Sequence, residues 1–299
     1  MKTNIDASWS YRRYQEVRHR FPNPVFPLRS DQIANLGDIT DGIDAFVFDA
    51  FGVLNVGETT IPTAIDRVSA IRTMGKKVRV LTNAASLSKA AACEKFESLG
   101  YDFTADEIVS SRQVLIDALL DRALEGQWGC IAPPGASFDD LPVDAMAFDP
   151  EYDGYTGIIF LGGASWDIQQ NETLTKWLKV RSVPFLVGNP DVVAPRGDWF
   201  SLEPGAYAHD IADQSAGTPE FFGKPFENAF DAVAKSIGRN VSRDRVLMVG
   251  DTLHTDILGG AAAGFKTCLV TSHGVMRDLD HMACITDSEI VPNYIVPAI

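Results

Sequence analysis

The segment VLMVGDTLHTDILGGAAAG, residues 246–264, joins an apolar run to a stretch rich in small residues. Val246–Val249 are expected to form a buried strand, and a helix is expected to follow Asp251 and to end near Gly264. Asp251 and Asp256 therefore flank the beginning of that helix. In open α/β sheets, ligands bind at the carboxyl ends of the strands. The segment predicts an α/β fold with acidic residues at its ligand-binding edge.

The rest of the chain repeats this alternation of apolar runs and helical patterns, which is typical of a parallel sheet with crossover helices. Strands that are covered on both faces read as nearly continuous hydrophobic runs. We predict an α/β fold with a Rossmann-like, doubly wound parallel sheet. Its remaining strand candidates are Ala45–Phe48, Val78–Leu81, Gly157–Leu161, Pro184–Val187 and Thr267–Val270.

Three more helices are predicted between these strands. The first spans 60–74, with Thr60 as its cap and a proline in its first turn. The second spans 86–100, with Ser86 as its cap. The third spans 224–237, where apolar residues follow helical spacing up to a closing glycine.

The middle of the chain is expected to form a domain of its own. Residues 113–208 contain a further set of strands and a helix, and we predict that they are a smaller α/β cap domain inserted into the larger one. The core domain is then made of residues 41–112 and 209–299. Residues 1–40, with several aromatics among charges and prolines, are predicted to be an N-terminal arm packed on the core.

Three further segments place a polar side chain at the end of an apolar run. Asp49 precedes a glycine at a sharp turn, Thr82 ends a strand, and Lys224 lies at a helix start. A carboxylate at such a turn can attack phosphorus or carbon, or bind a hard cation. The hydroxyl of Thr82 and the charge of Lys224 both suit a phosphate. These segments are AFVFDAFGVLNVG (45–57), VRVLTNAAS (78–86) and FFGKPF (221–226).

Carboxylates from two of the four segments are expected to meet. Asp49, Asp251 and Asp256 supply enough oxygen atoms to hold Mg²⁺ while leaving positions for water and substrate. His254, inside the same segment as two of them, is expected to be an exposed helix residue rather than a ligand.

Composition excludes several classes of protein. The net charge of −14 disfavours a nucleic-acid partner, because phosphate neutralisation needs clustered Lys and Arg. No apolar run is long enough to cross a membrane, and the first residues lack the apolar core of a secretory signal. The four cysteines are widely spaced and are expected to be free thiols. We expect a cytoplasmic protein.

The four segments, in this order, resemble the haloacid-dehalogenase (HAD) superfamily. Asp49 with Gly52 is similar to its first motif, Thr82 to its second and Lys224 to its third, and GDTLHTD (250–256) resembles its fourth. The late position of the cap, between the second and third motifs, resembles the NagD-like and nitrophenylphosphatase-like branch (subfamily IIA).

The resemblance implies a magnesium-dependent hydrolase, with a small phosphorylated metabolite as its substrate. Asp49 would be the nucleophile and form an aspartyl-phosphate. The Asp49 carboxylate, the backbone carbonyl of Phe51 and Asp251 would hold Mg²⁺, with Asp256 as a further ligand or as support. The residues expected to bind the phosphoryl group are Thr82, Asn83 and Lys224.

One position departs from the family's pattern. Phosphatases of the superfamily carry a second Asp two residues after the nucleophile, as general acid and base, and this chain has Phe51 there. Three alternatives stay open: a phosphatase with weak or specialised activity, a non-catalytic or regulatory protein that binds phosphorylated metabolites, and a haloacid dehalogenase. The late cap and the retained acidic residues count against the dehalogenase.

The cap is expected to determine specificity, because a lid supplies contacts to the non-reacting part of a substrate. The segment VGNPDVVAPRGD (187–198) resembles the cap loop that faces the active site in this branch. Asn189, Asp191 and Arg196 are therefore candidate substrate contacts. Cap-mediated dimers occur in the family, so the resemblance leaves a homodimer open.

Overall fold

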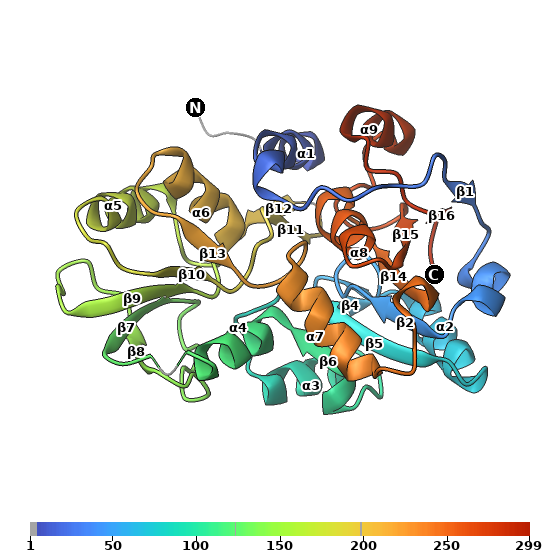
Figure 1. Cartoon of the computed structure of the whole chain (residues 1–299), viewed down its shortest axis with the longest axis horizontal. Helices are drawn as coiled ribbons and strands as arrows, with labels where there is room; N and C mark the ends of the chain where they lie inside the picture. Colours follow the sequence, from blue (N-terminus) through green and yellow to red (C-terminus); the bar gives the residue numbers. More distant parts are fainter. Residues whose placement is uncertain (1–4, 123, 198) are drawn as a thin grey trace.

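The computed structural model describes residues 5–122, 124–197 and 199–299, and within them two parallel sheets lie side by side as the centres of two lobes (Figure 1). All neighbouring strands of the larger sheet are parallel. In spatial order this sheet contains β1 (Asp31–Gln32), β16 (Tyr294–Val296), β15 (Lys266–Val270), β14 (Val246–Gly250), β2 (Ala45–Phe48), β5 (Lys77–Thr82) and β6 (Ile108–Ser110).

Helices cover both faces of this sheet, because the strands bury side chains in both directions. In β2, Phe46 and Phe48 pack with α2 and α3, whereas Ala45 and Val47 pack with α4 and α7. This arrangement confirms the predicted doubly wound α/β core. The helices of the core lobe are α2 (Pro62–Thr73), α3 (Lys89–Ser98), α4 (Ser111–Leu120), α7 (Glu227–Ile237), α8 (Leu258–Ala262) and α9 (His281–Ser288).

Two predicted helix caps are wrong. Thr60 lies in the short hairpin of β3 (Asn55–Val56) and β4 (Thr59–Thr60), and its hydroxyl donates to the carbonyl of Leu99. The helix after it begins at Pro62 without a side-chain cap. Ser88, not Ser86, caps α3 by accepting a hydrogen bond from the backbone of the first turn. Several Ser and Thr residues precede each helix, and the local sequence does not distinguish which one adopts the cap conformation.

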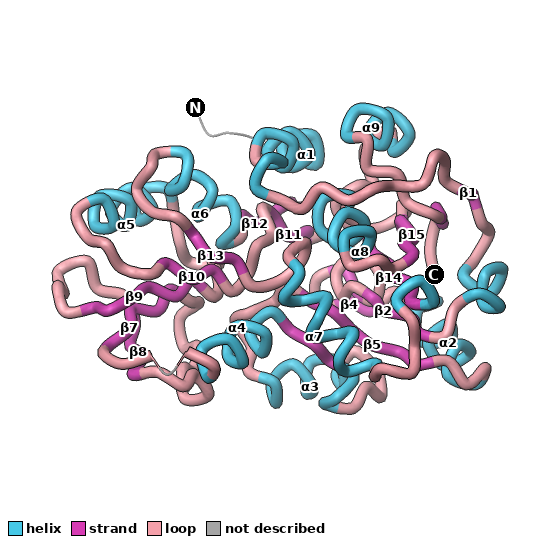
Figure 2. The backbone as a smooth tube through the Cα atoms, in the orientation of Figure 1, coloured by secondary structure: helices cyan, strands magenta, loops and turns pink. Residues whose placement is uncertain are grey.

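The smaller lobe is built on the second sheet, and we propose that it is the inserted cap. Figure 2 shows its strands as a group separate from those of the core. In spatial order they are β13 (Pro219–Phe221), β10 (Phe185–Val187), β9 (Tyr155–Phe160), β7 (Gln127–Ile131) and β8 (Asp144–Ala147). The lobe also contains α5 (Ile168–Lys179), α6 (Pro204–Asp213) and the antiparallel hairpin of β11 (Val193–Arg196) and β12 (Trp199–Leu202).

The expected cap boundaries at residues 113 and 208 both fall inside helices. The first cuts α4, which packs on β6 and α7 of the core. The second cuts α6, which packs on α5, β10 and β13 of the cap. We therefore propose 127–221, from the first to the last strand of the smaller sheet, as the inserted cap. It replaces 113–208.

The N-terminal arm contains a helix, α1 (Ala7–Glu16), capped by Asp6. Figure 1 shows α1 between α6 of the cap and α9 of the core, so the arm touches both lobes and not the core alone. The first four residues of the predicted arm lie outside the described residues. The expectation that His254 is exposed is wrong: its side chain lies against Tyr11 and Tyr14 of α1 and is only 1% exposed.

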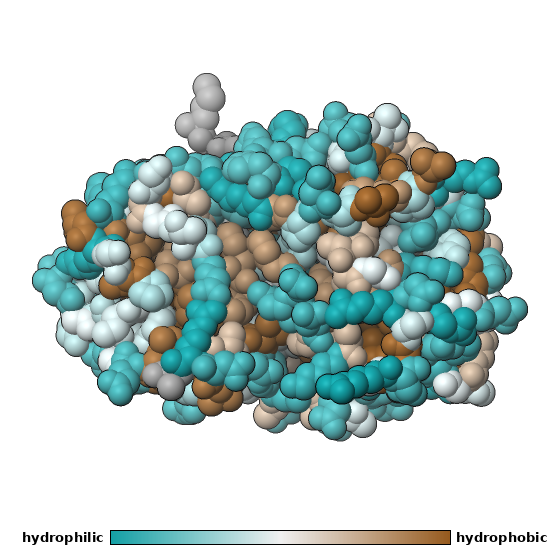
Figure 3. Space-filling model, in the orientation of Figure 1, coloured by the Kyte–Doolittle hydropathy of each residue, from teal (hydrophilic) through white to brown (hydrophobic). Residues whose placement is uncertain are grey.

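Figure 3 shows that hydrophilic residues cover much of one face of the molecule. Among the described residues, no helix combines the length and the apolar character needed to cross a membrane.

Candidate active site

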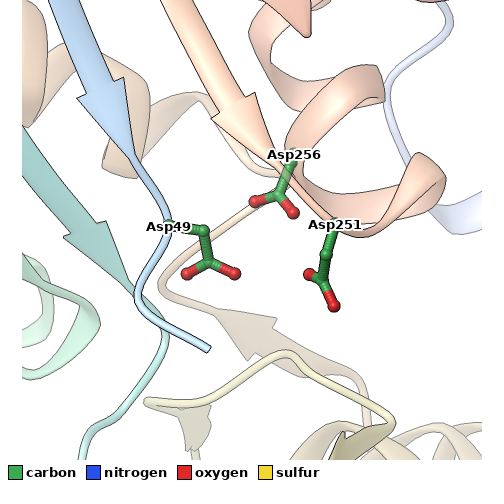
Figure 4. Close-up of side chains that lie close together, drawn as sticks. All are labelled: Asp49, Asp251 and Asp256. Atoms are coloured by element: carbon green, nitrogen blue, oxygen red, sulfur yellow. The ribbon is translucent and has the colours of Figure 1, made fainter. Parts of the chain in front are cut away.

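Three carboxylates meet at the carboxyl edge of the core sheet. β2 and β14 are neighbours in register, so Asp49 after β2 and Asp251 after β14 emerge at the same edge. Asp256 follows on the first helical turn. One oxygen from each of the three lies within 4.8 Å of the others. Figure 4 shows the three carboxylates turned into a common space.

Two glycines allow the chain to approach Asp251 closely. Gly52 has φ +79°, and a Cβ there would lie 2.6 Å from an oxygen of Asp251. Gly274 has φ +78°, and a Cβ there would lie 1.8 Å from the same oxygen, which accepts a hydrogen bond from the backbone N–H of Val275. Any larger residue at either position would displace the carboxylate.

Lys224 links two of the three carboxylates. Its Nζ lies 2.6 Å from Oδ1 of Asp49 and 2.7 Å from Oδ1 of Asp256, and the side chain is almost fully buried. Burial favours the neutral amine, but the charges of Asp256 and Asp49 outweigh it and raise the pKa of Lys224 above its usual value. The second oxygen of Asp256 accepts from the backbone N–H of Thr252, so Asp256 holds Lys224 in place.

The cluster contains three acidic groups and one ammonium group. Burial and the nearby Asp49 and Asp256 raise the pKa of Asp251. Burial also raises the pKa of Asp256, to about 7, against the opposing effect of Lys224. Three carboxylates facing one ammonium leave room for a further cation, and their hard oxygen atoms are the ligands that Mg²⁺ prefers. The residues present therefore fit magnesium.

A cavity of about 540 Å³ opens beside this cluster, between core and cap. Lys224 and Asp256 are not among the residues that line it and lie behind its wall, each at most 1% exposed. The other predicted site residues all line the cavity, namely Asp49, Phe51, Thr82, Asn83, Asn189, Asp191, Arg196 and Asp251.

Asn83 holds the core motifs together. Its amide oxygen accepts from the backbone N–H of Lys224 at 2.7 Å, and its amide nitrogen donates to the carbonyl of Lys224 at 3.0 Å. The same nitrogen donates to Asp191 of the cap loop at 2.9 Å. Next to it, the hydroxyl oxygen of Thr82 accepts from the backbone of Ala84, which leaves its own hydrogen to donate into the cavity. Asn83 is a structural link, and direct contact with substrate stays a prediction.

The cap loop brings a second acidic group to the cavity. Burial and the charge of Asp49 raise the pKa of Asp191 to about 8, although Lys224 lowers it. Asn189 donates to Glu203 at 3.1 Å and accepts from the backbone N–H of Asp191 at 3.0 Å. Arg196 donates to the same Glu203 at 3.3 Å. Residue 198, the end of the predicted loop, lies outside the described residues.

Two cationic side chains lie next to the ring of Phe51. The Nζ of Lys95 is 4.8 Å from the centre of its ring, and the Cζ of Arg196 is 5.5 Å from it. Lys95 belongs to the core and Arg196 to the cap, so the ring contacts both lobes. Such contacts contribute roughly 0.5–2 kcal/mol each.

Several polar lining residues were not expected from the sequence, among them Tyr14, Glu58, Lys95 and Glu203. None of these four belongs to a segment that follows an apolar strand. The aromatic residues of the arm were the one available signal for Tyr14, and they indicated packing and not a place in the cavity.

Comparison with known proteins assigns the family. A family model for haloacid dehalogenase-like hydrolases matches residues 46–137, and a second, HAD-hydrolase-like model matches 221–299. Phosphoglycolate phosphatase 2 of Arabidopsis thaliana is 30% identical over 263 residues, which cover 79% of this chain and 85% of that protein. Glycerol-3-phosphate phosphatase of Homo sapiens is 28% identical over 289 residues, covering 86% of this chain and 89% of that protein.

Solved structures agree on the fold. The crystal structure of a "possible sugar phosphatase" of the HAD superfamily from Cytophaga hutchinsonii superposes with a TM-score of 0.80 at 24% identity. The superposition covers 90% of this chain and 98% of that one, so the cap and the core are both shared. The chain belongs to the haloacid dehalogenase-like hydrolases, in the branch of NagD and the 4-nitrophenylphosphatases.

Proposed function

We propose that this hydrolase is a magnesium-dependent phosphatase that acts on a small phosphorylated metabolite through an aspartyl-phosphate on Asp49. The proposal rests on the hydrogen bonds of the Asp49 carboxylate. Oδ1 is held by the backbone N–H of Ala50 at 2.7 Å and by Lys224 at 2.6 Å. Among the described residues, none donates a hydrogen bond to Oδ2. One oxygen is therefore fixed, and the other is available to attack phosphorus at the cavity wall.

The surrounding residues supply positioning and charge. Asp49 and Asp251 would hold Mg²⁺, with the backbone carbonyl of Phe51 as a further ligand, and Asp256 would orient Lys224. The ion would neutralise charge on the phosphoryl oxygens. Thr82 would donate a hydrogen bond to the same group. Because Lys224 lies behind the wall, its role would be to restrain Asp49 more than to contact substrate.

Proton transfer requires a donor other than Phe51. Attack of Asp49 Oδ2 on phosphorus breaks the bond to the leaving oxygen, which takes the electron pair and needs a proton. We infer that Asp191 supplies it, since it lines the cavity and a pKa of about 8 keeps much of it protonated at neutral pH. Its carboxylate would then accept a proton from the water that cleaves the aspartyl-phosphate.

The cavity limits the substrate to a small molecule. Its volume of about 540 Å³ is in the range of sites for single metabolites. The relatives named above act on phosphoglycolate and glycerol 3-phosphate according to their names, and both compounds are small phosphomonoesters. We propose that the substrate is a compound of this kind and that Asn189, Asp191 and Arg196 contact it.

A second candidate function is non-catalytic binding of a phosphorylated metabolite, and Phe51 is the observation that favours it. The proximity of Asp49, Lys224, Asp251 and Asp256 supports catalysis instead. For a metal-free dehalogenase, the group of Asp49, Asp251 and Asp256 would have no use.

Phosphate release from a panel of phosphomonoesters, with Mg²⁺ and with a chelator, tests the proposal. Wild type should release phosphate only with Mg²⁺, and Asp49→Asn should abolish the activity. Asp41→Asn is the matched control, because Asp41 is an exposed carboxylate of the same lobe. No release from any compound, together with binding of inorganic phosphate in calorimetry, would establish the non-catalytic alternative.

A further inference from the structure

Helix α1 makes polar contacts with both lobes. On the cap side, Arg13 donates to Asp210 and to Asp213 of α6, at 2.7 Å each. Arg20, just after the helix, donates to the same Asp213 at 2.6 Å. Arg13 is largely buried, with 12% of its side chain exposed, so these ion pairs are shielded from solvent on one side.

On the core side, α1 binds α9 and the segment of the fourth motif. The hydroxyl of Tyr11 donates to Asp287 at 2.7 Å and to the carbonyl of Cys284 at 3.0 Å. Gln15 is hydrogen-bonded to His254 at 2.8 Å. His254 lies two positions before Asp256, so α1 contacts the turn that carries a predicted site residue. Figure 1 shows the helix between α6 of the cap and α9 of the core.

Tyr14 of α1 reaches the cavity itself. It is 2% exposed, and its ring stacks on His254 with centroids 5.2 Å apart and planes 8° apart. Its hydroxyl accepts the backbone N–H of Val192 at 3.0 Å, next to Asp191 of the cap loop. The same side chain lines the cavity. One residue of the arm therefore joins the fourth-motif turn of the core to the substrate loop of the cap.

We propose that α1 is a clamp that holds the cap in its position against the core, and that Tyr14 is a positioning residue for the cap loop around Asp191. The role in catalysis rests on the proposed phosphatase function, whereas the clamp itself does not. The cap and core are otherwise joined by the chain crossings around the cap and by polar contacts, which include Asn83 to Asp191, Arg112 to Asp140 and Arg277 to the carbonyl of Gly197. Loss of the clamp would let the loop move away from Asp49.

The buried apolar residues of the arm explain why α1 stays bound to both lobes. Tyr14, Val17 and Phe21 belong to one hydrophobic cluster with Val192 of the cap and Leu253 of the core. The burial of these apolar side chains contributes far more to the stability of the contact between arm and lobes than exposed ion pairs do. The clamp is expected to be part of the folded enzyme, and not an arm that binds and releases freely.

Hydrogen exchange on the full chain tests the clamp without any need for turnover. Tyr14→Phe keeps the ring but leaves the N–H of Val192 without its acceptor. We expect the amides of Asn189, Asp191, Val192 and Val193 to exchange about five- to ten-fold faster, the effect of one lost hydrogen bond, with β2 and β14 unchanged. Tyr152→Phe, on the cap surface, is the matched control.

Arg13→Gln provides a second variant that retains the arm's buried apolar residues. It should speed exchange in α6 and in 189–193 together, because both belong to the cap that the clamp holds. Unchanged exchange at 189–193 in both variants would overturn the proposal, whether or not the protein is a phosphatase.

Kinetics then test the positioning role. With 4-nitrophenyl phosphate, Tyr14→Phe should raise KM several-fold with a smaller change in kcat, because the loop is displaced while Asp49 is untouched. Equal KM values in Tyr14→Phe and wild type would contradict the positioning role. A protein without any activity would refute the proposed function and leave the exchange result to decide on the clamp.

Discussion

The ammonium of Lys95 lies 4.8 Å from the centre of the Phe51 ring. Phe51 occupies the position at which phosphatases of the superfamily are expected to have a second Asp. Lys95 also pairs with Glu58 at 3.1 Å, and Arg196 approaches the same ring from the cap. Phe51 therefore forms part of the cavity wall together with these two cationic side chains. Phe51 is thus adapted to its surroundings, and the acid–base function must come from elsewhere.

Restoring an acid at this position is expected to bring no gain. In Phe51→Asp the new carboxylate would pair with Lys95 and Arg196, which holds it ionised and unable to donate a proton. Hydrolysis of an alkyl phosphate such as glycerol 3-phosphate should stay equal or fall in a steady-state assay. Phe51→Leu controls for loss of the ring. A rise of about ten-fold or more in Phe51→Asp would show that Phe51 merely lacks the acid.

Asp191→Asn should separate substrates by their leaving groups. An alkoxide needs a proton and 4-nitrophenolate does not, so the variant should lose roughly 10²-fold in kcat on an alkyl phosphate and little on 4-nitrophenyl phosphate. Because the protonated acid is the active form and its pKa is about 8, wild-type activity on the alkyl ester should fall as pH rises above that value. Equal losses on both substrates would point to a structural role for Asp191.

Asp251→Asn should stabilise the metal-free protein at alkaline pH. Burial raises the folded pKa of Asp251 above its unfolded value, so the folded state binds more protons and becomes less stable as pH rises from the unfolded towards the folded pKa. An amide does not pay this electrostatic penalty. In thermal unfolding with a chelator at pH 8, the variant should melt above wild type.

Mg²⁺ should reverse the order of the melting temperatures of Asp251→Asn and wild type. Added Mg²⁺ should raise the melting temperature of wild type through binding to the folded state, and Asp251→Asn should lose most of the rise. Asp41→Asn should behave like wild type in both conditions. An equal magnesium effect in all three proteins would exclude Asp251 as a ligand.

Lys224→Met should destabilise the fold strongly and abolish activity. Removal of the ammonium leaves Asp49 and Asp256 without their counter-charge, and breaking a buried pair costs about 3–5 kcal/mol. Because Lys224 lowers the pKa of Asp256, its removal should leave Asp256 protonated at pH 5, which should relieve part of this loss. Denaturant unfolding at pH 5 and pH 8 measures the difference, and equal losses at both would contradict the charge argument.

The sequence by itself determined the four central strands of the core sheet, β15, β14, β2 and β5, and the residues at the carboxyl ends of β2, β5 and β14, but it did not predict β1, β6 or β16. Ala45–Phe48 is β2 without any change of bounds, and Asp49, Thr82 and Asp251 line one cavity as expected. These features are readable because a buried parallel strand is a local apolar run, and parallel strands must present their ends at the same edge.

Only the tertiary structure decided what completes the site. Tyr14 meets Val192 across 178 positions, and Asn83 meets Asp191 across 108. The burial of His254 under α1 follows from the same long-range packing. No local periodicity records such contacts, because they depend on how two lobes and an arm pack together, and the free energy of that packing is spread over many side chains that are far apart in the chain.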